Sequence, residues 1–237
     1  MKKTALITGS SDRIGKALAL ALAEKGYNLL LHYNSSSTKI EEVKNKAIQF
    51  GVQVKTVQWD FMKDRDYDVL FSDFKKNGFE IELLVNCASD FTPSSFENKG
   101  KEFLYQQFKI NFENAYLLTK AMARVYKTGE IINLLDTKTE KNYTQHLDYL
   151  LSKKLLRDFT QLAAVELAPH FRVNAISPGL VLPPKGKDEK YLLNLAENIP
   201  LKTIGNVNDI IKAFLFLLDS KFVTGQILYI DGGDHLI

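Results

Sequence analysis

Tyr149 and Lys153 are the residues of this 237-residue sequence whose types and spacing most directly suggest chemistry. They are four positions apart in a segment of helical periodicity, which places both side chains on one face of the helix. A neighbouring ammonium group favours the phenolate, so we expect it to lower the tyrosine pKa from its ordinary value of about 10. A tyrosine tuned in this way exchanges a proton with a carbonyl or imine while a hydride moves. An ordinary surface pair has the same spacing, so the surroundings must decide.

Two further polar residues belong to those surroundings. Asp136 lies 13 residues before Tyr149, at the end of a predicted strand, and Asn111 lies on the preceding predicted helix. These positions favour a functional pair over a surface pair. The predicted catalytic residues are Tyr149, Lys153, Asp136 and Asn111.

A glycine-containing turn follows the first predicted strand, between residues 8 and 15. Gly9 permits the tight bend, and Gly15 permits close approach of helix and strand. The free N–H groups at the start of the next helix then face a pyrophosphate. A purely structural turn has the same glycine pair, but the position between first strand and first helix favours a dinucleotide site.

The end of the second predicted strand indicates which nicotinamide cofactor is preferred. An NAD site places a carboxylate there, about 20 residues after the glycine turn. This chain instead has His32, Tyr33, Asn34 and a run of serines, with no acid before Glu41. The guanidinium of Arg13 can reach the same corner and suits a 2′-phosphate. We therefore predict NADPH; the alternatives are a solvated loop arginine and serines that cap a helix.

Short apolar runs alternate with amphipathic segments along nearly the whole chain. Such alternation predicts an α/β protein with a parallel sheet covered on both faces, because right-handed crossovers place helices there. We predict one doubly wound domain over 1–237, with a substrate lid at 183–200. The predicted strands lie near 5–7, 29–31, 52–57, 81–85, 131–135, 171–177 and 226–230, and the helices near 14–25, 39–50, 66–76, 101–127, 146–168 and 209–218.

Composition excludes several classes of protein. A net charge of +3, from 31 basic and 28 acidic residues, is too small for a dedicated nucleic-acid binder. No apolar run is long enough to span a bilayer, and the first one is cut short after Thr8, before a signal peptide would be complete. Cys87 is the only cysteine, which rules out an internal disulfide and disfavours a metal site. We expect a soluble, cytoplasmic protein without metal, nucleic acid or membrane partners.

With these residues in place, the chain resembles the short-chain dehydrogenase/reductase family over essentially its whole length. The joint spacing of the matching segments makes the resemblance specific. It implies a Rossmann-type fold, a bound nicotinamide cofactor and a homotetramer, or a homodimer, assembled through the two long central helices. The matching segments are 8–15, Asp60, 86–89, Asn111, Tyr149 with Lys153, 172–174, 177–179 and 231–233.

Several departures are similar to one branch of the family, the pteridine reductases and the dihydromonapterin or dihydrofolate reductases. Asp136 stands where most members have serine, Arg13 lies in the glycine turn, and residues 86–91 read Asn-Cys-Ala-Ser-Asp-Phe. His32-Tyr33, and the lack of a threonine shortly after Leu180, also fit this branch. Ser35 departs from it, because pteridine reductases often have an arginine there.

In that branch the phenylalanine at the position of Phe91 stacks on the pterin and holds it against the nicotinamide. A rigid aromatic platform suits a flat substrate, although a buried core phenylalanine is the alternative. Asp136 can accept hydrogen bonds from ring N–H groups when ionised, or donate one if burial raises its pKa; a turn aspartate is its alternative. Asn111 is expected to hold a water chain to Lys153, with capping or core roles as alternatives. His146 either lines the pocket or only starts a helix.

The resemblance also gives positions for the ligands. Cys87 has no base beside it in the motif and is expected to pack rather than react. The expected substrate residues are Ser89, Phe91, Asp136 and Tyr149. The expected cofactor-binding residues are Gly9, Ser11, Arg13, Ile14, Gly15, Tyr33, Asn34, Ser35, Ser36, Asp60, Phe61, Asn86, Ala88, Ser89, Tyr149, Lys153, Pro178, Gly179 and Leu180.

These residues together predict an NADPH-dependent reductase that transfers a hydride to a C=N bond of a dihydropterin, dihydromonapterin or dihydrofolate. One alternative is a 3-oxoacyl-thioester reductase, or another carbonyl reductase of the same family. Another is a non-catalytic scaffold that senses the cofactor, for which a proton-transfer pair is not needed.

Overall fold

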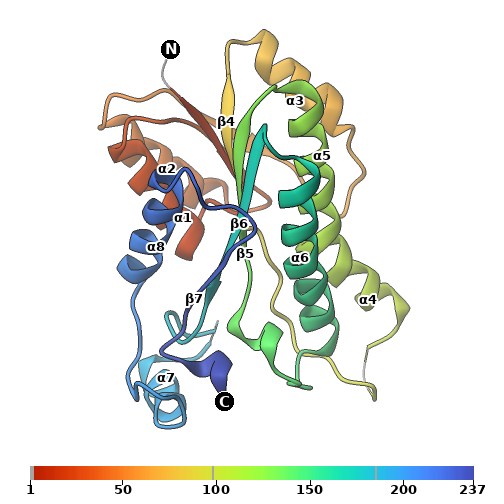
Figure 1. Cartoon of the computed structure of the whole chain (residues 1–237), viewed down its shortest axis with the longest axis vertical. Coiled ribbons are helices and arrows are strands. Elements are labelled where there is room, and N and C mark those ends of the chain that lie inside the picture. Colours follow the sequence, from red (N-terminus) through yellow and green to blue (C-terminus); the bar gives the residue numbers. More distant parts are fainter. Residues whose placement is uncertain (1–2, 98, 185) are drawn as a thin grey trace.

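The computed structural model describes residues 3–97, 99–184 and 186–237, which form a seven-stranded parallel sheet between two layers of helices (Figure 1). Residues 1, 2, 98 and 185 of the predicted domain, the last of them within the predicted lid, lie outside this description. The strands are β1 (Thr4–Ile7), β2 (Asn28–Tyr33), β3 (Val54–Gln58), β4 (Ile81–Asn86), β5 (Gly129–Leu134), β6 (Phe171–Pro178) and β7 (Ile227–Ile230).

The strand order is β3-β2-β1-β4-β5-β6-β7, so the direction of winding reverses between β1 and β4. In such sheets ligands bind outside the carboxyl ends of the strands at this reversal. The predicted seven-stranded, doubly wound α/β fold is confirmed. The glycine turn after β1 and the segment after β4 therefore meet at the same place.

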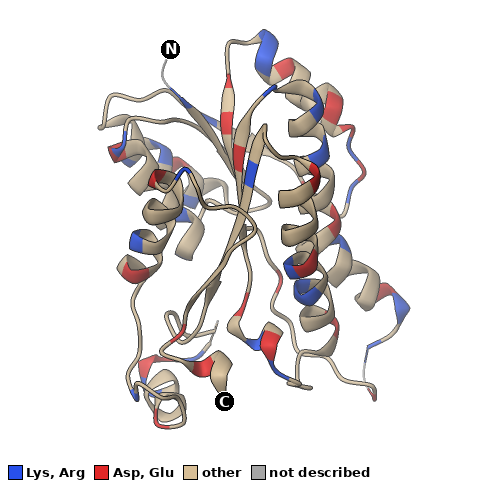
Figure 2. Ribbon diagram, viewed as in Figure 1, with Lys and Arg blue, Asp and Glu red and all other residues tan. Residues whose placement is uncertain are grey.

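The helices lie on both faces of the sheet, α1, α2 and α8 on one and α3, α5 and α6 on the other (Figure 1). Charged residues of both signs are interspersed along the outer helices (Figure 2). The helices are α1 (Arg13–Glu24), α2 (Ser37–Ile48), α3 (Tyr67–Lys76), α4 (Lys101–Phe108), α5 (Asn114–Val125), α6 (Leu147–Glu166), α7 (Glu189–Ala196) and α8 (Val207–Asp219), and the single-turn helices are η1 (Lys109–Glu113), η2 (Thr137–Glu140) and η3 (Asp234–Leu236).

Successive residues of the central strands supply two separate cores. Ala5 and Ile7 of β1 pack in the layer of α1 and α8, whereas Leu6 between them packs in the layer of α3 and α5. This arrangement follows from the strand period of two, which sends neighbouring side chains to opposite faces. Because both faces are covered, these strands are apolar throughout rather than alternating.

The long helix predicted over 101–127 is interrupted. α4 passes through the π-helical turn η1 before α5 begins. The Lys109 carbonyl accepts from the Asn114 backbone N–H, five residues on, and also from the Asn114 side chain, 2.6 Å away, where the regular helical pattern widens. Asn111, one of the predicted catalytic residues, lies inside this turn.

Two other boundaries differ from the prediction. β5 ends at Leu134, so Asp136 is not its last residue but the N-cap of η2, where its side chain accepts from the Lys138 backbone N–H. The segment 183–200 contains the helix α7, which begins where the Asp188 side chain accepts from Tyr191 N. Its two prolines obscured the short amphipathic pattern that follows them.

No helix among the described residues is long and apolar enough to cross a membrane. Within the same residues, no group of three or more His, Cys, Asp or Glu side chains is arranged to hold a metal ion.

Candidate active site

The glycine turn is fixed by close contacts with its surroundings. Gly9 has φ +64°, and a Cβ there would lie 2.7 Å from the Ala88 Cα. A Cβ on Gly15 would lie 2.3 Å from the Gly9 carbonyl oxygen. The Thr8 hydroxyl oxygen accepts from the backbone N–H groups of Cys87 and Ala88, at 2.9 and 3.0 Å. Both glycines are therefore required by space, as the sequence predicts.

His32, at the end of β2, fastens this turn from the other side. Its Nδ1 accepts from Gly9 N at 3.2 Å, and its Nε2 donates to the Trp59 carbonyl at 3.0 Å. The ring stacks on both Trp59 and Phe61, with centroids 4.3 and 4.5 Å away. Burial, opposed by the bond to Trp59 and assisted by Arg65, lowers the pKa of His32 to about 4. A neutral ring is what accepting from Gly9 requires.

Two cations lie at the glycine turn, the expected Arg13 and also Lys39. The Arg13 guanidinium donates to the Leu182 carbonyl at 3.3 Å, and so bridges the turn to the segment after β6. Lys39, in the first turn of α2, forms an ion pair with Asp12, the N-cap of α1. Tyr33 is half-buried at the end of β2, and the next two residues, Asn34 and Ser35, are exposed.

Other predicted cofactor residues occupy the carboxyl ends of the strands. Asp60 closes the turn after β3 by accepting from Met62 N at 2.9 Å. The Asn86 side chain donates through Nδ2 to the Asn133 Oδ1 at 2.8 Å, and its own Oδ1 is buried without a partner among the described residues. Gly179 lies against Asp231, where a Cβ would be 2.6 Å from the Asp231 Cβ. The carboxyl ends of β3, β4 and β6 thus contribute to one edge, as the sequence predicts.

The structure brings Tyr149, Asp136 and Lys153 together. The Tyr149 hydroxyl donates to Asp136 Oδ2 at 3.0 Å. The Lys153 Nζ donates to the Leu134 carbonyl at 2.7 Å and lies 5.9 Å from the centre of the Tyr149 ring. Tyr149 and Lys153 are both buried and come from one face of α6. The predicted helical pairing is therefore present.

In the protein without a bound ligand, the pKa of Tyr149 is shifted in the opposite direction from the one predicted. Burial raises the pKa of Tyr149 well above its ordinary value, and the Asp136 carboxylate raises it further. Burial also lowers the pKa of Lys153, to about 8. The spacing of the two residues predicted that the lysine cation would lower the tyrosine pKa. It could not include the loss of water around both groups, which has the larger effect on the pKa here. The phenol is held protonated, with its proton directed at the carboxylate.

Asn111 supports a loop rather than offering its side chain to water. Its Oδ1 accepts from the Ser89 hydroxyl at 2.8 Å and from Asp90 N at 2.9 Å, and its Nδ2 donates to Gln107 at 3.0 Å. The side chain is 1% exposed. These contacts match the core alternative for the side chain, because the protein itself occupies both ends of the amide, and the water chain to Lys153 stays a prediction. Asn111 thereby positions the segment after β4.

Phe91 lies on that segment, beside the phenol. Its ring stacks on His146 with centroids 3.9 Å apart and meets Tyr149 edge-on at 4.8 Å. The ring is half-buried, which is inconsistent with an interior core position. The Ser94 backbone N–H donates to the Gln145 carbonyl at 3.1 Å, which ties the segment to the start of α6.

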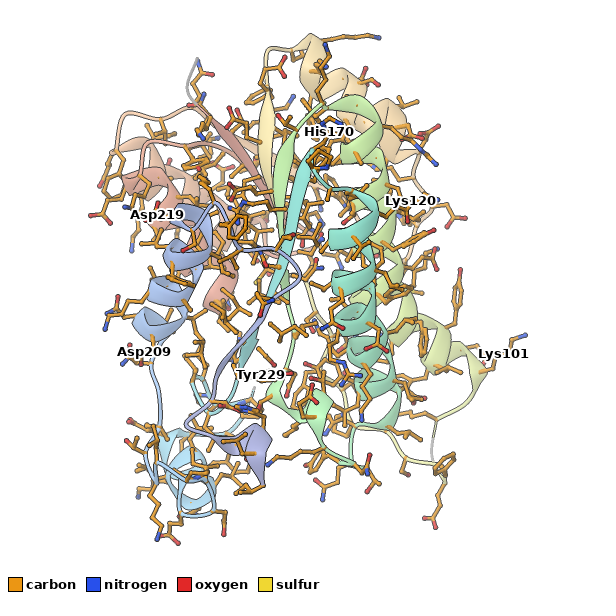
Figure 3. The ribbon with its side chains drawn as sticks, viewed as in Figure 1. Lys101, Lys120, His170, Asp209, Asp219 and Tyr229 are labelled. Carbon is orange, nitrogen blue, oxygen red and sulfur yellow. The ribbon has the colours of Figure 1, made fainter. Side chains whose placement is uncertain are left out.

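The C-terminal segment fastens the loop that carries Asp136. Thr137 donates to Asp231, and Lys141 pairs with Asp234. Tyr229, labelled in Figure 3, donates to Glu140 at 2.6 Å and stacks on His235 with centroids 4.1 Å apart. The final residues of the chain therefore hold η2 in place.

The family is decided by comparison with known proteins. A family model described as enoyl-(acyl carrier protein) reductase matches residues 9–235. The chain is a short-chain dehydrogenase/reductase. It is 32% identical to the uncharacterized oxidoreductase YmfI of Bacillus subtilis, over 99% of this chain and 100% of that protein. It is 30% identical to the 3-oxoacyl-[acyl-carrier-protein] reductase FabG of Staphylococcus epidermidis, over 100% of both.

Solved structures of this family are also similar. FolM alternative dihydrofolate reductase 1 from Brucella suis, in complex with NADP, has a TM-score of 0.92 at 28% identity, covering 99% of this chain and 96% of that one. The acetoin dehydrogenase YohF from Salmonella typhimurium has a TM-score of 0.89 at 28% identity, covering 100% and 97%. The overall backbone is thus shared by family members that carry different substrate names.

Three residues that support this site were not predicted from the sequence. From the sequence, His32 enters only as part of a segment and no role is predicted for its ring. A histidine near the end of an apolar strand, with Trp59 and Phe61 after the next strand, was a usable signal for a buried ring. Lys39 lies at the start of a predicted helix, and its contact with Asp12 joins the first turn of one helix to the N-cap of another. Asn114 gave no local signal, because its role depends on the π-helical turn.

Cys87 packs beside the site as expected. Burial raises the pKa of its thiol to about 12, which leaves almost no thiolate at neutral pH.

Proposed function

We propose that this short-chain dehydrogenase/reductase is an NADPH-dependent reductase that transfers a hydride to a C=N bond of a dihydropterin. The observation that carries the proposal is the hydrogen bond from the Tyr149 hydroxyl to Asp136 Oδ2, next to the half-buried ring of Phe91. A protonated phenol, a carboxylate and a flat aromatic surface are the three groups that a hydrogen-bonding heteroaromatic substrate needs. A simple ketone needs only the first.

The residues of this chain suit a nicotinamide dinucleotide on two grounds. Side chains at Gly9 and Gly15 would fill the space of the turn at the sheet's reversal, and the side-chain Oδ1 of Asn86 is buried there without a partner among the described residues. The turn would hold the phosphates at the start of α1, and Lys153 would hold the nicotinamide ribose. When bound, the cofactor supplies the hydride.

NADPH is favoured over NADH by charge. No carboxylate follows β2 in the positions where an NAD site uses one. Arg13 and Lys39 place two cations at the glycine turn instead. The FolM structure that resembles this chain holds NADP.

The chain's own groups have separate tasks in this proposal. Tyr149 keeps a proton at its hydroxyl oxygen and passes it to the substrate nitrogen. Asp136 orients that hydroxyl and accepts from ring N–H groups of the pterin. Phe91 supports the flat face of the substrate, and Asn111 positions the segment that carries Phe91. The segment 183–200 with α7 would close over the bound substrate.

The test is oxidation of NADPH by the purified protein, followed at saturating cofactor with dihydrobiopterin, dihydromonapterin and dihydrofolate. We expect turnover with at least one of them and much weaker turnover with an acetoacetyl thioester. Absence of turnover with all three dihydropterins would overturn the substrate assignment.

A 3-oxoacyl-thioester reductase is the second candidate, because relatives named for that activity are 30% identical over the full chain. Asp136 argues against it, since a carboxylate that already accepts from the phenol is less suited to a ketone oxygen than a small hydroxyl group. Preference for acetoacetyl thioester in the same assay would establish it. A cofactor-sensing scaffold would bind NADPH and reduce none of these compounds.

Assembly through the central helices is part of the same proposal. α6 exposes Leu151, Leu155, Leu162 and Val165, the last two by 70% and 81%. Exposed apolar side chains along one helix are typical of an interface between copies. We propose a homotetramer, or a homodimer, and the mass in solution from light scattering tests it.

A further inference from the structure

Four side chains form a wall beside the phenol, which we call the aromatic–lysine wall: Phe91, Tyr143, His146 and Lys138. The His146 ring is stacked with each of the other two rings, with centroids 3.9 Å from Phe91 and 5.8 Å from Tyr143. The Lys138 Nζ lies 4.2 Å from the centre of the Tyr143 ring and 5.3 Å from that of Phe91. The wall thus joins the proposed stacking surface to a cation.

Lys138 is fixed to the reactive groups through its backbone. Its N–H donates to Asp136 Oδ1 at 2.9 Å, while Asp136 Oδ2 accepts from the Tyr149 hydroxyl. Both carboxylate oxygens are therefore engaged by other groups, and neither pairs with the Lys138 ammonium. Lys138 follows Asp136 by two residues and belongs to the turn that Asp136 caps.

The charge of Lys138 is left without a counterion. Among the residues that the structure describes, no carboxylate lies within ion-pair distance of its Nζ. Other cations of the same region do have partners, since Lys141 pairs with Asp234 and Arg157 with Glu140. Aromatic faces attract an ammonium group but leave its charge in place.

Nothing else on the wall offsets this charge. Burial lowers the pKa of His146, and Lys138 lowers it further against the opposing effect of Asp136, so the imidazole is neutral at physiological pH. Tyr143 donates to Gln145 at 2.6 Å, and its pKa is raised by burial and by neighbouring Tyr191 and Asp136, so it carries no charge either. The wall has one fixed positive charge, half-buried, beside a flat aromatic surface.

We infer that Lys138 binds an anionic group on the substrate's side chain, so that the preferred substrate is a dihydropterin with a carboxylate or phosphate on its tail. The inference rests on the proposed function, because it needs the pterin ring beside Phe91. A half-buried ammonium binds an anion more strongly than an exposed one, since water competes less for both charges. A neutral tail would leave the ammonium unpaired.

The experiment compares kcat/KM for three substrates: dihydrofolate, which has tail carboxylates, a dihydropterin with a phosphate ester on its side chain, and dihydrobiopterin, which has a neutral side chain. In Lys138→Met we expect the preference for the anionic substrate over dihydrobiopterin to fall about tenfold, the effect of one charged hydrogen bond. Lys138→Arg should restore most of that preference. The two anionic substrates distinguish carboxylate from phosphate recognition.

Lys154→Met is the matched control, because Lys154 is a half-buried lysine of α6 outside the wall. It should leave the preference unchanged. A second readout is ionic strength, since added salt should raise the KM of the wild-type enzyme for the anionic substrate and have little effect on that of Lys138→Met.

The outcomes separate the two proposals. A wild-type enzyme that reduces dihydrobiopterin as well as both anionic substrates, with a preference that Lys138→Met does not change, overturns the anion site and leaves the reductase intact. A protein that reduces no dihydropterin overturns the proposed function, and the anion site with it.

Discussion

The two ends of the proposed site are built in different ways. The glycine turn itself is held by hydrogen bonds within the chain, because Gly9 N donates to His32 Nδ1 and the Ser10 hydroxyl donates to the His32 carbonyl at 3.0 Å. Around Asp136, by contrast, the Lys138 ammonium and the buried His146 Nδ1 have no hydrogen-bond or ion-pair partner among the described residues. The backbone of the glycine turn is thus held by the chain itself, although Asn86 Oδ1 nearby has no partner among the described residues, whereas the substrate end leaves a charged group unpaired.

This difference follows from what each end must recognise. The phosphates of a dinucleotide are bound by backbone N–H groups, in space that glycines leave free. Both features depend on the local conformation of the chain and not on the identity of a side chain. A substrate ring is recognised by side-chain identity. The substrate end can therefore vary while the cofactor end stays constant. The similar structures agree with this, since one is named a dihydrofolate reductase and another an acetoin dehydrogenase.

The largest effect is expected at the substrate end, in Tyr149→Phe. Removing the hydroxyl that donates to Asp136 should lower kcat by about 10²- to 10⁴-fold, the usual contribution of a positioned proton donor. Binding of NADPH, measured by fluorescence titration, should change little, because the hydroxyl has no contact with the glycine turn. Tyr126→Phe is the control, since that buried phenol donates to the Phe79 carbonyl far from the site. Wild-type turnover in Tyr149→Phe would remove the proton role.

The next effect concerns stability at the cofactor end and depends on pH. The pKa of His32 is about 4 when folded and about 6.5 when unfolded, so the unfolded chain binds the proton more readily. The stability due to neutral His32 is complete above pH 6.5 and is lost as the pH falls toward 4. The loss is about 3 kcal/mol over that window.

Urea unfolding of the wild type and of His32→Asn, between pH 7 and 4.5, measures this term. His32→Asn should be less stable at pH 7 and show a shallower decline with falling pH. His170→Asn, at an exposed position, should decline as the wild type does. Parallel curves for wild type and His32→Asn would show that His32 is not held neutral.

The smallest of the three effects is expected for Gly15→Ala. The new Cβ would meet the Gly9 carbonyl at 2.3 Å, so the turn must move, at a cost of about 1–3 kcal/mol. The dissociation constant for NADPH should rise about tenfold, with kcat at saturating NADPH much less affected. Gly26→Ala is the control, because Gly26 has φ +85° and open space around it, so the change strains the backbone without touching the turn. An unchanged NADPH affinity in Gly15→Ala would contradict the close packing.

Much of this architecture could be predicted from local patterns. The alternation of apolar runs and amphipathic helices predicted the seven-stranded sheet, and the glycine pair predicted the tight turn, because each depends on residues close together in the chain. α7 was missed because its pattern is short and follows two prolines. The interruption at η1 was missed because it depends on Asn114, whose side chain joins its own backbone N–H in donating to the Lys109 carbonyl, and apolar periodicity does not record such a contact.

The role of Asn111 shows the limit of such patterns. Its position in a predicted helix indicated a catalytic contribution, but its partners Ser89 and Asp90 belong to another segment, so only the fold reveals that it supports a loop. The contact of Lys39 with Asp12 could not be predicted for the same reason. Neither could the contacts between the C-terminal residues and η2.

The sequence by itself determined which groups face one another along a single helix or strand: Tyr149 with Lys153, and the glycines that leave room for phosphates. The tertiary structure decided how those groups behave. Burial between α6 and the sheet raises the pKa of Tyr149 and lowers that of Lys153. The turn after β5 leaves the Lys138 ammonium outside ion-pair distance of every carboxylate that the structure describes. Spacing is a property of neighbouring residues, whereas desolvation and the choice of partner depend on segments that only folding brings together.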